Sequence, residues 1–440
     1  MPLPEPRHAV SVARAVVLLT VIGVTVRAGM FLVYQPVVYP DTNMYVTLAS
    51  QLLHFDFTDY TGVRTPGYSL LLLLAGQSPF VVWLMQSAMG VLISLLLFWI
   101  CFTHTGNGSW SVVAGLLHSL ALNQLFFEAN ILSETFSTLL VVLSVACLVS
   151  ALKNGPRPAY GVAAGVVSAV VTLTRVVYVY VGPLFALLVW LFERDARRVA
   201  VSLGVAFLIP VLGWGAFNKV TIDHFGLSTM TGYNLTNHSG AFMERAGDQH
   251  ATIRDIYLKY REQQIAKTGS HSMTIFSARG EMLKKTGLDN VHLSRQLTKL
   301  SLELFVNNPA VYLRSVAESW ARFWAAPLYT RSNQFSVPGA ARAVESVWRV
   351  ERVLVLTMNA LAILASAWVL ISAVARRLKG IAGLPIPVIV ACVVMGASVL
   401  QALAEFGENA RYGIPTQSLA ATLVLLVAWD IRSALVRRHI

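Results

Sequence analysis

The stretch Val10–Phe31, VSVARAVVLLTVIGVTVRAGMF, decides the fold class of this protein. At 1.5 Å per residue, a helix of this length crosses a bilayer hydrocarbon core of about 30 Å. No small-residue cleavage site follows it, so we expect a retained helix rather than a signal peptide. Similar apolar runs recur along the chain, and together they predict an all-α polytopic integral membrane protein. The expected helices are about 10–33, 80–103, 110–126, 130–152, 158–174, 176–192, 199–217, 351–375, 384–404 and 411–431.

The composition of the whole chain agrees with this class. Of 440 residues, 55% are hydrophobic and only 13% are charged, more apolar surface than a soluble core of this length hides. The net charge of +12 is typical of basic loops beside a membrane, and no basic tract interleaved with aromatics predicts nucleic-acid binding. Cys101, Cys147 and Cys392 lie inside apolar runs, where they predict packing rather than metal ligation.

The polar stretches divide the chain into three parts. Residues 1–217 form an N-terminal transmembrane module with a first loop at 34–66, residues 218–350 a polar loop domain, and residues 351–440 the C-terminal transmembrane helices. Within the loop domain, 252–266 and 300–325 are amphipathic and predict helices. The apolar stretch Gly67–Gly76 is too short to span a membrane.

The charges of the short loops give the helices a direction. If the N-terminus is cytoplasmic and the helices alternate, the basic turns fall on the cytoplasmic side, as the positive-inside rule requires. These turns contain Lys153, Arg157, Arg194, Arg197, Arg198, Arg376, Arg377 and Lys379. The first loop, the 218–350 domain and the Glu405–Arg411 segment then share the extracytoplasmic face.

Two charged residues of the first loop have competing interpretations. Asp41 follows Pro40 at a natural N-cap position for a helix that starts at Thr42, and it is either only a cap or a general base. Arg64 stands in the segment Arg-Thr-Pro-Gly-Tyr, where Pro66 and Gly67 predict a turn at the membrane surface. It is either an interfacial anchor or a phosphate contact.

Further charges lie where lipid does not tolerate them. Glu134 is predicted about one turn into a helix, and Arg175 lies between two apolar runs, so both are expected to face the protein interior. Glu134 either pairs with an arginine or positions an acceptor. Arg411 precedes the last helix beside Tyr412, and its guanidinium either binds an anionic group or is neutralised by Glu408.

The ordered set of these motifs resembles a known superfamily. Asp41 followed by Tyr45 and Ala49, Arg-Thr-Pro-Gly-Tyr ending at Tyr68, Ser133-Glu134, Thr174-Arg175 and Ala410–Pro415 resemble the GT-C membrane glycosyltransferases. The branch with protein O-mannosyltransferases and lipid A aminoarabinose transferases is the most similar. The resemblance covers most of 10–217 and 351–431 and not 218–350. One departure is Thr42, where many relatives have Glu.

The resemblance implies a GT-C fold with a helical extracytoplasmic loop domain, in a bacterial inner membrane. It implies inverting transfer of a sugar from a polyprenyl-phosphate donor to an extracytoplasmic lipid, glycan or protein. Asp41 would be the base, Arg64, Arg175, Arg411 and Tyr412 would bind the donor phosphate, and Tyr45, Tyr68, Glu134 and Glu408 would have acceptor or structural roles. A divalent metal is possible but unsupported, because Thr42 removes a second carboxylate. The alternatives are a transporter or lipid flippase and a non-catalytic assembly protein.

Overall fold

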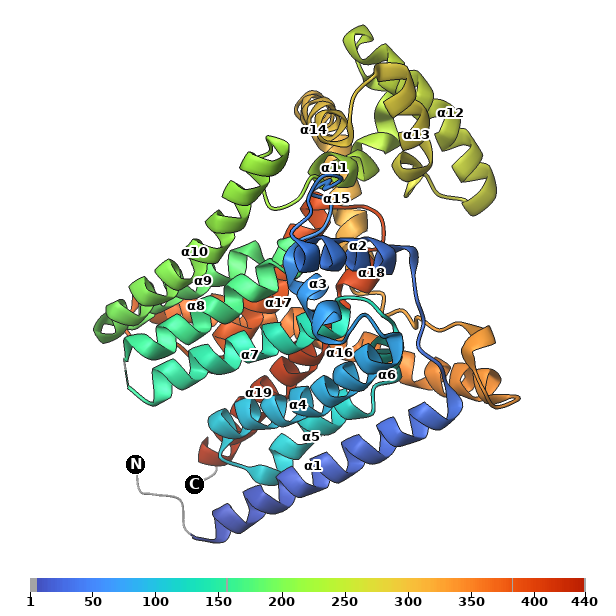
Figure 1. Ribbon diagram of the computed structural model, residues 1–440. Helices are drawn as coiled ribbons and strands as arrows, with labels where there is room; N and C mark the ends of the chain where they lie inside the picture. Colours follow the sequence, from blue (N-terminus) through green and yellow to red (C-terminus); the bar gives the residue numbers. More distant parts are fainter. Residues whose placement is uncertain (1–5, 156, 382, 439–440) are drawn as a thin grey trace.

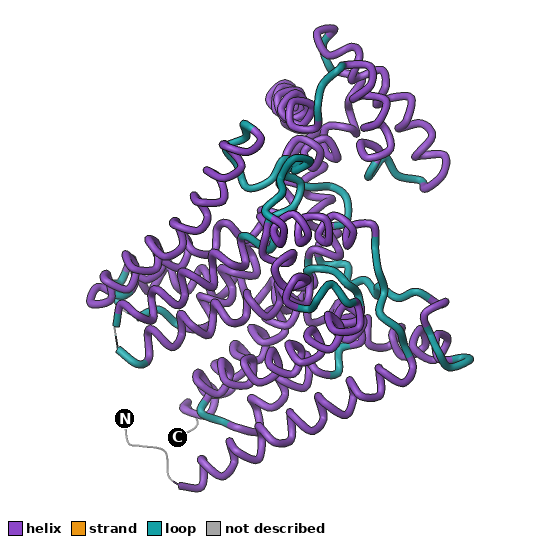
Figure 2. Tube along the Cα trace, in the orientation of Figure 1, coloured by secondary structure: helices purple, strands orange, loops and turns teal. Residues whose placement is uncertain are grey.

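The computed structural model describes residues 6–155, 157–381 and 383–438, so residues 1–5 of the predicted N-terminal module lie outside it. The described chain is almost wholly helical and contains no β-strand, only the isolated bridges Tyr34–Phe335 and Val37–Asn130 (Figures 1 and 2). The α-helices are α1 (Pro6–Val33), α2 (Pro40–His54), α3 (Pro66–Leu74), α4 (Pro79–Thr105), α5 (Gly108–Ser119), α6 (Leu122–Ala129), α7 (Glu134–Lys153), α8 (Pro158–Thr172), α9 (Val181–Phe192), α10 (Arg197–Ile222), α11 (Thr231–Ser239), α12 (Ala251–Thr268), α13 (Thr274–Thr286), α14 (Asn290–Asn307), α15 (Pro309–Phe323), α16 (Ala340–Leu378), α17 (Ile386–Ala404), α18 (Asn409–Tyr412) and α19 (Ile414–Arg438).

The apolar helices confirm the predicted polytopic architecture. Within the described residues, seven helices are long and apolar enough to cross a membrane, namely α1, α4, α7, α10, α16, α17 and α19. An eighth span results if α5 and α6, which are bent by 50°, are counted together. Two shorter apolar helices cover Pro158–Thr172 and Val176–Phe192. Helices α7 and α17 are the most buried, whereas α1 lies at the edge of the bundle (Figure 1). The protein is an integral membrane protein.

The predicted helix 110–126 is broken. Helix α5 ends at Ser119 and α6 begins at Leu122, and the change of direction frees backbone groups from the helical ladder. The Leu122 amide donates instead to Glu351 Oε1 of α16, at 2.8 Å. Irregular backbone inside a membrane protein is tolerated where another part of the protein supplies the missing partner. Glu351 is that partner, and the local sequence around Leu122 does not predict this contact with α16.

The predicted start of the next helix at 130 is wrong as well. Residues 130–133 are irregular and pair with the chain that leaves α1: Val37 N donates to Ala129 O at 2.9 Å, and Ile131 N donates to Val37 O at 2.9 Å. Helix α7 therefore begins at Glu134 itself, which lies in its first turn rather than one turn inside it. This shift brings Glu134 to the end of the bundle near α2.

The 218–350 segment folds into short helices around a small core of its own. Buried residues from α11 to α14, with Leu297, Leu293 and Met282 among them, form this core. The predicted helix 252–266 is confirmed by α12, and the predicted helix 300–325 is divided into α14 and α15, because Pro309 begins a new helix. Helix α16 starts at Ala340, eleven positions before the predicted 351. Its first turns contain charged residues, so a search for apolar runs did not detect them.

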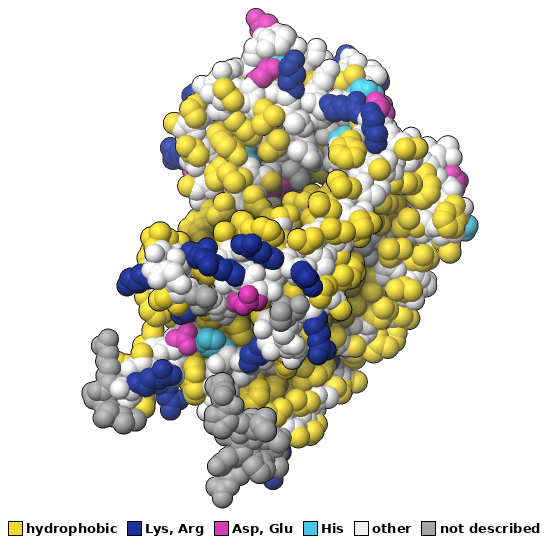
Figure 3. All heavy atoms as spheres, turned by 90° about the vertical axis from the view of Figure 1, so that its left-hand side faces the viewer, with side chains coloured by type: hydrophobic (Ala, Val, Ile, Leu, Met, Phe, Trp, Pro, Cys, Tyr) yellow, Lys and Arg dark blue, Asp and Glu magenta, His cyan; other side chains and the backbone are white. Residues whose placement is uncertain are grey.

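The bundle has two chemically different ends. One end, which we call the basic end, comprises the ends of α7, α9 and α16 and the starts of α8 and α10. Its basic residues are Lys153, Arg157, Arg194, Arg197, Arg198, Arg376, Arg377 and Lys379. Figure 3 looks onto this side, where Lys and Arg side chains stand beside broad apolar surface. Loops, α2, α3 and α18 gather at the other end of the bundle, below α11–α15 (Figures 1 and 2).

Candidate active site

The first loop begins with a helix that presents Asp41. Pro40 takes the first helical position of α2 and Tyr39 is its N-cap, so the prediction that Asp41 caps this helix is wrong. The Thr42 hydroxyl accepts from the Tyr39 amide at 3.0 Å and donates to Ile131 O at 2.7 Å. Thr42 therefore fixes the start of α2 against the irregular segment before α7, and the Asp41 carboxylate is left free for other partners.

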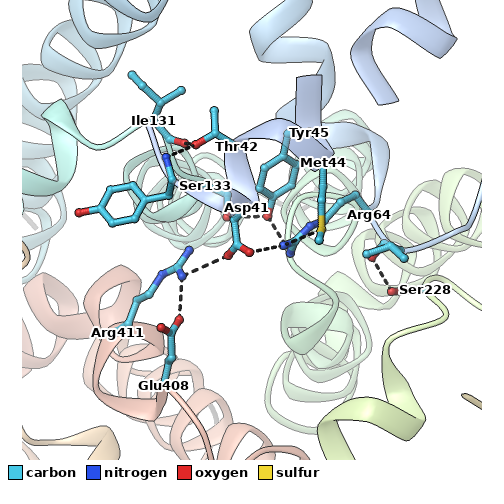
Figure 4. Close-up of polar contacts among 12 residues, drawn as sticks. Asp41, Thr42, Met44, Tyr45, Arg64, Ile131, Ser133, Ser228, Glu408 and Arg411 are labelled. Atoms are coloured by element: carbon cyan, nitrogen blue, oxygen red, sulfur yellow. Dashed lines mark hydrogen bonds and ion pairs between the residues drawn. The ribbon is translucent and has the colours of Figure 1, made fainter. Parts of the chain in front are cut away.

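Arg64 is the first of these partners. Its Nη2 lies 2.7 Å from Asp41 Oδ1, and its guanidinium stacks over the Tyr45 ring with 4.7 Å between carbon and centroid (Figure 4). Pro66 then starts α3, and Gly67 N donates to Leu173 O at 2.7 Å. A Cβ on Gly67 would meet Thr174 Oγ1 at 2.3 Å, so only glycine allows this contact. The turn thus holds Arg64 beside the segment that carries Arg175.

Arg411 of α18 contacts three carboxylates from three elements. Its Nη1 donates to Asp41 Oδ2 at 3.2 Å and to Glu408 Oε2 at 2.8 Å (Figure 4). Its Nε donates to Glu134 Oε1 at 2.5 Å. Its side chain is only 7% exposed. Charge-assisted bonds of this kind are the strong ones, so Arg411 ties the first loop, α7 and the last loop together.

Arg175 completes the cluster from the other side of Glu134. Its Nη1 donates to Glu134 Oε1 at 3.0 Å, and its guanidinium lies 4.6 Å from the Tyr412 ring centroid. Glu134 is fully buried, as expected for a charge that avoids lipid. One Glu134 oxygen receives both arginines, while its Oε2 has no hydrogen-bond partner among the described residues.

The two tyrosines of the motif lie under this network. The Tyr45 hydroxyl donates to Ser133 Oγ at 3.4 Å, and the Tyr68 hydroxyl donates to Gln86 Oε1 of α4 at 3.0 Å. The two rings pack edge to face, with 5.0 Å between centroids. Among the described residues, the Tyr68 hydroxyl bonds no charged side chain, and its ring supports that of Tyr45.

The electrostatics of the cluster are balanced. Arg64, Arg175 and Arg411 face Asp41, Glu134 and Glu408, three cations against three anions. Burial alone would raise the pKa of the Asp41 carboxyl, but the guanidinium groups of Arg64, Arg411 and Arg175 outweigh it and hold this pKa below its ordinary value. Asp41 is thus an ionised carboxylate, and its side chain is 33% exposed.

Several donors of the arginines are unused by the protein. Arg411 Nη2 and Arg175 Nη2 make no hydrogen bond to any residue that the structure describes, and the buried Arg64 Nε is also unpartnered there. An anion with several oxygens would find donors here without first breaking every ion pair. For a metal, the described ranges contain no group of three or more His, Cys, Asp or Glu side chains that could hold one.

Two further contacts of buried acidic residues were not anticipated from the sequence. Glu128, expected in a surface loop, is buried in α6, where its Oε1 lies 2.5 Å from Arg27 Nη2 of α1. Glu405 is buried beyond the end of α17 and accepts from Asn237 Nδ2 at 2.6 Å. Asn237 belongs to the polar stretch 233–244, which packs inside the loop helices. An arginine inside an apolar run was the only signal for the first pair.

No protein-family model and no curated protein matches the chain. Among solved structures, it aligns with the oligosaccharyltransferase AglB from Archaeoglobus fulgidus, in complex with an inhibitory peptide and a dolichol-phosphate, at 15% identity and a TM-score of 0.48. That alignment covers 98% of this chain and 52% of AglB, so the chain spans about half the length of that structure.

A second solved structure that aligns is apo ArnT from Cupriavidus metallidurans. The identity is 14% and the TM-score 0.40, over 94% of this chain and 78% of ArnT. The likeness is one of fold.

Proposed function

We propose that this protein is an inverting membrane glycosyltransferase that moves a sugar from a polyprenyl-phosphate donor to an acceptor hydroxyl. The observation that carries the proposal is the contact of one partly exposed carboxylate, Asp41, with two arginines that retain free donors. A single carboxylate is what direct inversion needs from a base, whereas two carboxylates across a glycosidic bond suit hydrolysis.

The arginines suit the leaving group. A prenyl phosphate is already ionised at neutral pH, so its departure needs charge stabilisation more than a proton. Arg411 is nearest the base, and Arg175 lies on the far side of Glu134 with its guanidinium over Tyr412. Phosphate oxygens bound to the free nitrogens of Arg411 and Arg175 would leave the sugar carbon on the side of Asp41.

A groove beside the site fits the prenyl tail. It lies between α5, α16 and α19, has a volume of about 780 Å³, and is lined mainly by apolar side chains such as Leu117, Leu354 and Met358. Asn359 and Gln417 line both this groove and a smaller pocket next to Ala410 and Gly413, which flank Arg411. Each buried methylene of a tail contributes about 0.8 kcal/mol, so a long prenyl chain anchors the donor in this groove.

The distribution of charges supports one side of the membrane for the reaction. Asp41 lies at the opposite end of the helices from the basic end, and basic turns remain in the cytoplasm. We therefore assign the reaction to the extracytoplasmic face, with the α11–α15 helices beside it as part of the acceptor region. The sugar and the acceptor class, whether lipid, glycan or protein, are left for the experiment to identify.

The test compares Asp41→Asn with Asp56→Asn in purified full-length protein. Asp56 is an exposed aspartate of the same loop, and its carboxylate hydrogen-bonds only to Thr58 among the described residues, so it is a matched control. A panel of radiolabelled polyprenyl-phosphate sugars is offered together with lipid, glycan and peptide acceptors. Labelled acceptor and released prenyl phosphate are measured, together with donor binding. Asp41→Asn is expected to lose about 10²–10⁴-fold in turnover and to keep donor binding, and Asp56→Asn to keep both.

Two outcomes would refute the proposal. Full turnover by Asp41→Asn would show that Asp41 is not the general base. Transbilayer movement of prenyl phosphates by the wild type without any sugar transfer favours a flippase, the main alternative for a bundle with interior charges.

A further inference from the structure

A second groove lies between α8 and α10, away from the candidate active site. Its volume is about 800 Å³, and its walls are the branched side chains of Val162, Val166, Val201, Val205 and Ile209. It opens at the basic end of the bundle. Asp41, Arg64 and Arg411 belong to the other end, so this groove is separate from the site and from the apolar groove beside α16.

The groove follows from the way in which the two helices pack. A Cβ on Gly161 would meet Val199 O at 2.5 Å, and one on Gly165 would meet Leu203 O at 2.3 Å. The helices therefore touch along their glycine line, as small-xxx-small pairs do, and valines stand on either side of the contact. Ser202 Oγ donates to Pro158 O at 3.0 Å and ties the two helices together at the mouth. Such a groove exists before any ligand binds.

The mouth of the groove carries two arginines. Arg197 and Arg198 line it, and the Arg197 guanidinium lies 4.9 Å from the centroid of the Trp190 ring. Neither arginine takes part in an ion pair within the part of the chain that the structure describes. The nearby Glu193 carboxylate is engaged by the Leu384 amide at 2.6 Å. Trp at this level is typical of the membrane–water interface.

The length of the groove fits one leaflet. From Arg197 to Pro210, α10 advances by about 20 Å at about 1.5 Å per residue. Half of a hydrocarbon core of about 30 Å is about 15 Å, so the apolar part of the groove reaches the bilayer midplane while the arginines stay at headgroup depth. The groove therefore matches an amphiphile with an anionic head and an acyl tail.

We propose that an anionic glycerophospholipid occupies this groove, with its phosphate on Arg197 and Arg198 and an acyl chain along the valines. The donor of the proposed reaction does not belong here, because its phosphate would have to lie at Arg411 on the opposite side of the membrane. Helix α8 leads directly to Thr174 and Arg175 of the site, and α10 leads to the loop helices. A lipid in the groove would hold these two helices at a fixed spacing.

Native mass spectrometry of the full-length protein tests this proposal. The protein in detergent is offered equimolar phosphatidylglycerol and phosphatidylcholine with the same acyl chains. The wild type is expected to retain phosphatidylglycerol at least tenfold over phosphatidylcholine. Arg197→Gln/Arg198→Gln is expected to lose this preference, while Arg376→Gln/Arg377→Gln, which removes equal charge from the same end outside the groove, keeps it. Val205→Trp fills the groove and is expected to lose the lipid with both arginines in place.

The melting temperature of each variant reports whether it is folded. If both double variants lose the phosphatidylglycerol preference equally, the preference comes from general attraction to positive charge at this end, and the proposal is overturned. Retention by Val205→Trp, or equal binding of phosphatidylcholine, would overturn it too. Displacement of phosphatidylglycerol by equimolar polyprenyl phosphate would assign the groove to the prenyl lipid instead.

Discussion

Arg411 Nη1 donates a hydrogen bond to Asp41 Oδ2 at 3.2 Å, across 370 residues of sequence. The same guanidinium reaches Glu134 and Glu408, so one side chain joins the first loop to the last. The contact makes the candidate base and the candidate phosphate ligand a single unit. Whatever moves Arg411 also changes the environment of Asp41.

Arg411→Lys is expected to abolish activity although it keeps the charge. A lysine ammonium is a point donor and does not bridge three carboxylates on separate elements as the planar guanidinium does. We expect at least a 100-fold loss of sugar transfer. Arg411→Gln is expected to lose in addition about 1.5–3 kcal/mol of stability, because the buried Glu134 keeps only Arg175 as a charged partner.

Transfer assays and thermal unfolding in detergent measure the two effects separately. The control is Arg349→Gln, an exposed arginine of α16 that bonds only Ser346 among the described residues. Wild-type activity in Arg411→Lys would show that charge alone suffices at this position.

The pH dependence of the reaction is expected to differ between free enzyme and donor complex. Asp41 acts as a base only when ionised, so activity falls as the pH drops through its pKa. In the free protein the arginines hold that pKa below 3.8, although burial opposes them. A phosphate bound to Arg411 and Arg175 offsets their charge, and the pKa of Asp41 then rises.

The acidic limb of kcat/KM reports the free enzyme and that of kcat the complex. We therefore expect the limb of kcat at a higher pH than the limb of kcat/KM. Coincident limbs would mean that the donor leaves the ion pairs of Asp41 unchanged.

The apolar helices and the charged residues that cluster in the candidate site were predictable because each depends on short stretches of sequence. Spans are visible as apolar runs, and Asp41, Arg64, Glu134, Arg175 and Arg411 are conspicuous because charges beside apolar helices are costly. The predicted alternation of the helices places these residues at the same end of the bundle, where the structure shows them in direct contact. The grouping of these residues at one end therefore needed no knowledge of the pairing.

The features that were missed depend on partners far along the chain. The break after α5 needs Glu351, some 230 positions later, to satisfy the Leu122 amide. The late start of α7 needs Val37 from the other end of the first loop. From the sequence, Thr42 was interpreted only as the absence of a second carboxylate. Its hydrogen bond to Ile131 O, which fixes the start of α2, could not be predicted from the local sequence. Local pattern carries no information about such long-range hydrogen bonds.

Removing one partner of the Arg27–Glu128 pair is expected to lower stability strongly, whereas replacing both by apolar side chains is expected to change it little. Both side chains are buried, and Arg27 also donates to Ser119 Oγ at 3.4 Å. Removing one partner leaves an unpaired charge in the bundle, so Glu128→Ala is expected to cost about 3–5 kcal/mol. Arg27→Met/Glu128→Met fills the same space without charge and is expected to be near neutral.

Thermal unfolding in detergent distinguishes these variants. Arg14→Met, on the exposed part of α1, is the matched control for losing an arginine from this helix. A double methionine variant as unstable as Glu128→Ala would show that the ion pair itself stabilises the docking of α1.

Stability is expected to fall as the pH rises from 4.5 to about 8, because of Glu405. Burial raises the pKa of the Glu405 carboxyl to about 8, and the nearby Glu408 adds to the rise, although the Asn237 side chain and the Gly407 amide donate to it and lower the pKa. Below pH 4.5 the group is protonated in both the folded and the unfolded state. Between pH 4.5 and about 8 only the unfolded state loses the proton, so stability declines over this window, by an amount on the order of a few kcal/mol.

Glu405→Gln removes this ionisation and keeps a side chain that can accept from Asn237. Melting temperatures from pH 5 to 9 should therefore decline for the wild type and stay nearly level for the variant, with the two proteins most alike at pH 5. Glu262→Gln changes an exposed glutamate of α12 and should retain the wild-type slope. Parallel slopes for wild type and Glu405→Gln would mean that Glu405 is ionised in the folded protein, and that the contact with Asn237 at the junction of loop helices and bundle is charge-assisted.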